Sequence, residues 1–75
     1  AMSAEHYGWA VAVTAYRDTG DSLQIRTRAY GVGTWHQEDA ERYATEESDK
    51  LWPRSEGWAF QIAAFQLTLS KGDML

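Results

Sequence analysis

Cysteine is absent from this 75-residue chain, and Pro53 is its only proline. Without cysteine the chain can form neither disulfides nor thiolate metal sites. It has no run of 18 apolar residues and no basic segment leading into an apolar one, so we expect neither a membrane span nor a secretion signal. Basic residues are also scarce, with seven against eleven acids and a net charge of −4, which disfavours binding through non-specific phosphate contacts. We therefore expect a cytoplasmic protein.

Large aromatic rings are abundant instead. The chain has four Trp, four Tyr and two Phe, and each such side chain can bury roughly 150–250 Å². A domain of this length buries only about 60% of the surface that its unfolded chain exposes. Because disulfides are excluded, oligomerisation is one of the few ways left to stabilise it. The composition therefore predicts a surface too apolar for a monomer.

Hydrophobic periodicity predicts three strands and one helix in the order β-β-α-β. Residues 7–16 (YGWAVAVTAY) alternate with period two and are apolar on both faces, which favours a central strand. Turn-forming residues at 17–22 precede a second alternating segment at 22–30, and a third lies at 58–69. We predict one α+β domain over residues 2–69, with a three-stranded antiparallel sheet in strand order 2-1-3 and the helix packed on one face. Residues 70–75 are expected to fray.

The faces of the outer strands follow from the same alternation. In the second strand, Leu23, Ile25, Thr27 and Ala29 share one side, which we expect to face the helix. The open face would then carry Ala10, Ala12, Tyr16, Arg26, Arg28 and Tyr30. In the last segment the apolar phase changes at Ala63-Ala64, which predicts either a β-bulge or two shorter strands.

The helix is expected to begin after Thr34, which would be the N-cap of a capping box with Gln37. It is expected to end near Leu51 or Trp52, because Pro53 cannot continue it. Its apolar stripe would contain Ala40, Tyr43, Ala44 and Leu51, with Glu47 inside the stripe. A buried carboxylate must be paired or protonated. Glu47 is therefore a candidate catalytic acid or cation anchor, although a structural pair with its head at the rim is the commoner situation.

No set of residues predicts catalysis, a cofactor or a metal. No second carboxylate converges on Glu47, and no nucleophile elbow is present. His36 and Glu38 point about 200° apart on a helix, so the His-x-Glu-Asp sequence makes no site. Gly31-Val32-Gly33 lacks the rest of a phosphate-binding fingerprint. We therefore predict a protein that is not an enzyme.

Two surfaces are candidates for binding. Arg26, Arg28 and Tyr30 alternate on one strand, with Tyr16 expected nearby, and such a face could stack bases and neutralise phosphates. Nucleic acid is nonetheless a poor partner for an acidic chain. Ala10, Ala12 and Thr14 would form a flat surface onto which the sheet of a second copy could pack, while edge-to-edge strand pairing is the alternative.

The leading hypothesis is a non-catalytic protein–protein interaction module that is itself a homodimer. Single-stranded nucleic-acid binding is the alternative. Six of the eleven acids lie in the predicted helix, which would form an acidic side able to steer a basic partner.

Overall fold

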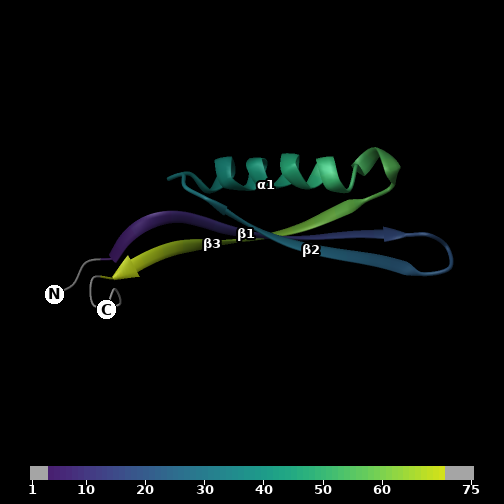
Figure 1. The fold of residues 1–75 in the computed structure, drawn as a ribbon, viewed down its shortest axis with the longest axis horizontal. Coiled ribbons are helices and arrows are strands. Elements are labelled where there is room, and N and C mark those ends of the chain that lie inside the picture. Colours follow the sequence, from purple (N-terminus) through teal and green to yellow (C-terminus); the bar gives the residue numbers. More distant parts are fainter. Residues whose placement is uncertain (1–3, 71–75) are drawn as a thin grey trace.

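The computed structural model describes the backbone of residues 4–70 and the side chains of residues 7–68. The elements are β1 (Ala4–Asp18), β2 (Leu23–Val32), α1 (Gln37–Leu51), a short 3-10 turn η1 (Arg54–Glu56) and β3 (Ala59–Ser70). The strands form one antiparallel sheet in the order β2-β1-β3. Helix α1 lies on one face of this sheet, as Figure 1 shows. The α+β fold, the element order and the strand order predicted from the sequence are confirmed.

The core lies between the middle strand and the helix. Val11 and Val13 of β1 are buried against Ala40 and Ala44 of α1. The two alanines let the helix backbone approach the sheet closely, because they add little volume between the layers. Larger, partly buried side chains surround this centre: Trp9, Tyr30, Val32, Phe60, Ile62 and Ala64.

The helix is much shorter than the sheet. Fifteen residues of α-helix extend about 22 Å, whereas the fifteen residues of β1 extend about 50 Å. The molecule measures 55 × 21 × 14 Å, and the sheet continues past both ends of α1 (Figure 1). One face of the sheet is therefore only partly covered, and the other face has no layer on it within the described residues.

The helix begins two residues later than a Thr34 cap requires. Its N-cap is His36, with no side-chain cap bond, and the Thr34 hydroxyl accepts the His36 amide at 3.4 Å. The predicted capping box is therefore wrong: Gln37 is the first helical residue, and its amide group donates to Glu41 instead. The predicted end is confirmed, because α1 stops at Leu51 before Pro53.

The buried stripe of α1 differs from the predicted one. Ala40, Ala44 and Ser48, spaced four residues apart, face the sheet. Tyr43 and Leu51 are about half exposed, so their assignment to the buried stripe is wrong. The hydroxyl of Ser48 has a partner on the sheet, described below, which allows a polar residue at this buried position.

β3 is continuous where a bulge was predicted. Its residues from Ala59 to Leu67 pair with β1 without interruption, and the register shift lies in β1, between His6 and Gly8. The change of apolar phase at Ala63-Ala64 has another cause: Phe60 and Ile62 face the helix, whereas Phe65 and Leu67 lie on the open face. Ser70 belongs to β3 rather than to the expected tail, and residues 71–75 lie outside the described residues.

The β1–β2 turn determines which side chains share a face. Four residues, Thr19–Ser22, separate the paired Asp18 and Leu23. The Asp18 carboxylate accepts the Gly20 amide at 2.8 Å, and Gly20 has φ of +91°, a conformation favourable only to glycine. Because the loop has an even number of residues, odd-numbered residues of β1 lie opposite even-numbered residues of β2.

Candidate functional site

The open face of the sheet carries no charged side chain over its central rows. Its residues alternate with the covered ones along each strand, and their cross-strand partners follow from the register. From the Gly8 row to the Tyr16 row, the face consists of Gly8, Ala10, Ala12, Thr14 and Tyr16 on β1, Ile25, Thr27, Ala29 and Gly31 on β2, and Ala59, Gln61, Ala63, Phe65 and Leu67 on β3. Leu23 continues it on β2, paired with Asp18.

Side-chain size on this face is smallest in the middle. Ala29, Ala12 and Ala63 form one row across the three strands. Larger apolar side chains lie toward the two ends, and they are strongly exposed: Phe65 is 60% exposed, Leu23 59% and Ile25 51%. The flat centre is therefore bordered by Leu23 and Ile25 of β2 toward one end and by Phe65 of β3 toward the other.

The three residues proposed for a dimer contact all lie on this face. Ala12 is exposed, and Ala10 and Thr14 are partly exposed. Sequence reasoning missed Ile25 because it assigned the apolar side of the second strand to the core, and it missed Phe65 because it attributed the change of phase in the last strand to a bulge or a break. The change of phase within 58–69 was the available signal for an apolar open face.

The predicted ligand-binding set is divided between the two faces. Arg28 and Tyr30 pair with Val13 and Val11, so they lie on the side of the helix, as does Arg26. Tyr16 pairs with Ile25 on the open face. The prediction that these four residues share one face is therefore wrong, and the four-residue turn is the reason. Ligand binding by Arg26, Arg28 and Tyr30 alone stays a prediction.

Tyr30 is fixed between the sheet and the helix. The Ser48 hydroxyl, which is fully buried, donates to the Tyr30 hydroxyl at 3.0 Å. The ring of Tyr43 meets the Tyr30 ring edge-on, with centroids 6.2 Å apart. These contacts hold the β2 edge against the middle of α1.

Replacing Tyr30 by Phe is expected to lower the free energy of unfolding by about 1 kcal/mol, because the buried Ser48 hydroxyl loses its partner. Urea unfolding followed by circular dichroism at a fixed protein concentration measures this change. The double variant Tyr30→Phe/Ser48→Ala should recover most of the loss, since no buried hydroxyl is then left unpaired. Equal stability of Tyr30→Phe and the parent chain would contradict this role.

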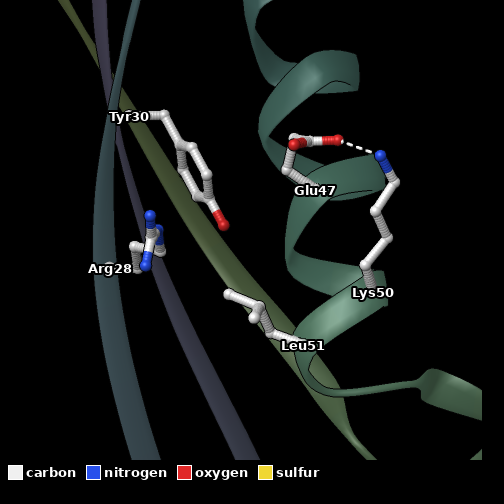
Figure 2. A pocket seen from close by; sticks show the side chains of 5 residues that line it. All are labelled: Arg28, Tyr30, Glu47, Lys50 and Leu51. Carbon is white, nitrogen blue, oxygen red and sulfur yellow. Dashed lines mark hydrogen bonds and ion pairs between the residues drawn. The ribbon is translucent and has the colours of Figure 1, made fainter.

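A pocket with a volume of about 150 Å³ opens beside Tyr30, between β2 and α1. Figure 2 shows Arg28 and Tyr30 extending from the strand, with Glu47, Lys50 and Leu51 opposite them on the helix. Glu47 is about one-third exposed and forms an ion pair with Lys50. The predicted buried carboxylate is therefore at the rim of the helix–sheet contact and paired, because Ser48 occupies the buried position beside it.

Lys50 and Asp49, near the C-terminal end of α1, have shifted pKa values. Each of them is paired with a neighbouring residue. The hydrogen bond to Glu47 raises the pKa of Lys50 above its ordinary value. The backbone amide of Arg54 donates to the Asp49 carboxylate at 2.8 Å and lowers the pKa of Asp49. Both groups are consequently charged at neutral pH, and of the two only Lys50 lines the pocket.

Beyond the C-terminal end of α1, Arg17 links three segments. Its guanidinium donates to the Gln24 side chain and to the Glu56 carbonyl, and it lies 4.5 Å from the centre of the Trp58 ring. A cation over an indole ring is attracted by the ring quadrupole. Arg17 therefore attaches the hairpin to η1 and the start of β3, and its role here is structural.

No metal cluster was found within the described part of the chain, where no three His, Asp or Glu side chains converge. None of the helices in this part is long and apolar enough to cross a membrane. Comparisons with protein-family models, with curated proteins and with solved structures found no match to this chain.

Proposed function

We propose that this chain is a protein–protein interaction module that assembles as a homodimer through the open face of its sheet. The observation that carries the proposal is the absence of charge from the Gly8 row to the Tyr16 row of that face, together with its strongly exposed Phe65 and Ile25. Depletion of charged residues is the compositional mark of the centre of a protein interface.

The area of the face suits a dimer. Nine residues of strand and three strands give a projected area of about 400 Å², from the spacings of β-structure. Side chains stand up from this plane, so the accessible area is larger than the projection; a stable interface buries ~800 Å² on each partner. A monomer rarely exposes an apolar patch larger than about 300–600 Å².

The distribution of charge permits a second copy as the partner. Each chain carries a net charge of −4, and α1 carries acids in its first turn and along its exposed side. Face-to-face packing would place the two helices on the outer sides of a four-layer sandwich. Two sheets would then separate the helices by more than the ~8 Å Debye length at physiological salt, so repulsion between them is screened.

The arrangement of side-chain sizes supports the same geometry. The alanine row of Ala29, Ala12 and Ala63 lets two sheets approach closely at the centre. Twisted sheets diverge away from the contact centre, and the larger side chains at both ends of the face would fill that space. Because a two-fold dimer uses the same patch on both copies, one such face is sufficient.

Edge-to-edge pairing is the alternative geometry. β3 is an edge strand of twelve residues, and its segment AFQIAAFQLTLS contains neither a charge nor a proline. Natural proteins usually protect exposed edges with such residues. Pairing of two β3 strands across a two-fold axis would remove this exposure and form a continuous six-stranded sheet.

Light scattering across a series of protein concentrations, at low and high salt, tests the proposal. We expect a mass twice the 8.5 kDa of one chain, unchanged by salt, because burial of apolar surface is insensitive to ionic screening. A mass of one chain at every concentration would contradict the homodimer. A dimer that dissociates with salt would contradict the apolar face as its contact.

A further inference from the structure

The β2 edge of the sheet differs from the β3 edge in carrying cations. β2 pairs only with β1, so the backbone groups on its other side have no strand partner within residues 4–70. Arg26 and Arg28 alternate along this edge and project on the side of α1. An unpaired edge offers a row of backbone donors and acceptors to an added strand.

These two arginines have no carboxylate partner in the described part of the chain. The ion pairs there use Arg42, Lys50 and Arg54. Arg26 donates only to the adjacent Ile25 carbonyl, and the Arg28 guanidinium lies 5.4 Å from the centre of the Tyr30 ring. In a chain with an excess of acids, two exposed arginines without carboxylate partners on one strand edge are available for an external anion.

The pocket of Figure 2 lies beside this edge, and its uncharged lining residues are Tyr30 and Leu51. Tyr30 is held by Ser48, and Leu51 is 51% exposed at the opposite wall. Lys50 neutralises the Glu47 carboxylate at the rim, so the unpaired charge in the pocket is that of Arg28.

We propose that the β2 edge binds an extended acidic segment of a partner protein by β-strand addition. In this mode backbone hydrogen bonds supply affinity and alternate side chains supply specificity. Acidic side chains two residues apart in the added strand match the spacing of Arg26 and Arg28, since both strands repeat every second residue. The acidic side chain opposite Arg28 would lie at the mouth of the pocket, within reach of the Arg28 guanidinium.

A peptide suits this edge better than a nucleic acid. Tyr30 is packed edge-on against Tyr43 and bonded to Ser48, so its ring is not available to stack on a base. Tyr16, the other ring expected to stack, lies on the opposite face. Strand addition also uses the backbone groups of the β2 edge, for which a nucleic acid has no matching repeat.

Fluorescence anisotropy with a labelled peptide of alternating glutamate and valine tests the proposal. We expect saturable binding that Arg28→Ala weakens about tenfold, the effect of losing one charge-assisted hydrogen bond. Arg42→Ala is the matched control, because it removes the same charge from an exposed helical site paired with Asp39. It should leave the affinity unchanged.

A second readout identifies the binding mode. In amide hydrogen exchange followed by NMR, the peptide should slow the exchange of every second amide of β2, those that point away from β1, and should leave the exchange of the β3 amides unchanged. Protection confined to α1 or to β3 would overturn the proposal.

Three further results would overturn it: no binding of the acidic peptide, equal binding of a peptide of alternating lysine and valine, or an equal effect of Arg42→Ala. Tighter binding of a single-stranded thymidine oligonucleotide, weakened by Arg28→Ala, would assign the edge to nucleic acid instead. The inference does not depend on the homodimer, because the open face and the β2 edge use different groups. Peptide binding should therefore persist in an Ala12→Arg chain whatever its mass.

Discussion

Ala12→Arg is expected to convert the proposed homodimer into a monomer. Ala12 is the middle residue of the alanine row on the open face, and it is exposed in the single chain, so an arginine there meets no neighbour that prevents folding. In a face-to-face dimer its charge would lie between two apolar sheets, where an unpaired charge costs several kcal/mol. Light scattering should give the 8.5 kDa mass of one chain, with the circular dichroism spectrum unchanged.

Ser55→Arg is the control for this experiment. Ser55 is exposed in η1, and the variant adds the same charge away from the open face. It should leave the mass of the dimer unchanged. If Ala12→Arg also leaves the mass unchanged, face-to-face packing is wrong, and slowed amide exchange along β3 in the dimer would then identify the edge-to-edge form.

Gly8→Ala is expected to destabilise the fold by about 3 kcal/mol or more, because two separate penalties act at this position. Gly8 has φ of +135°, which side-chain-bearing residues rarely adopt. A Cβ atom there would also lie 2.2 Å from the carbonyl oxygen of Val32 and 3.0 Å from the Cα of Gly33. Both neighbours are backbone atoms, so no side-chain rotation relieves the clash. Urea unfolding measures the loss.

Gly33→Ala is the matched control for Gly8→Ala. Gly33 has no positive φ, and no atom lies within 4 Å of the place that an alanine Cβ would occupy there. Its replacement should therefore change the free energy of unfolding by no more than about 1 kcal/mol. Equal effects of the two substitutions would show that β1 and the end of β2 do not approach each other closely at Gly8.

Element type and strand order could be predicted from the sequence because both depend on strong local patterns. Residues 7–16 are apolar on both faces, and only the middle strand of a three-stranded sheet has a neighbour on each side. The face presented by the second strand depended instead on the number of residues in the turn. Counting Thr19–Ser22 as the loop would have placed Arg26 and Arg28 on the side of the helix, and a loop longer by one residue would reverse this.

The buried stripe of the helix was harder to predict, since the position of Ser48 depends on a partner that is distant in sequence. A serine is polar, and only the Tyr30 hydroxyl across the layer makes its burial favourable. Leu51 and Tyr43 are more hydrophobic, yet the short helix crosses mainly the middle strand and leaves them at its borders. The open face was partly predictable: Ala10, Ala12 and Thr14 were identified, whereas Phe65 and Ile25 were not.

The position of β3 in the sheet has a consequence for how the chain folds. β1 and β2 are adjacent in sequence and close a four-residue turn, whereas the pairing of β1 with β3 brings Ala4 opposite Ser70, across nearly the whole chain. Closing so long a loop is slow compared with forming a hairpin. We therefore expect the uncharged β3 segment to be the last strand to pair with the sheet. Until it pairs, this segment is exposed to other unfolded copies, and we expect the folding chain to be most prone to aggregate in that interval.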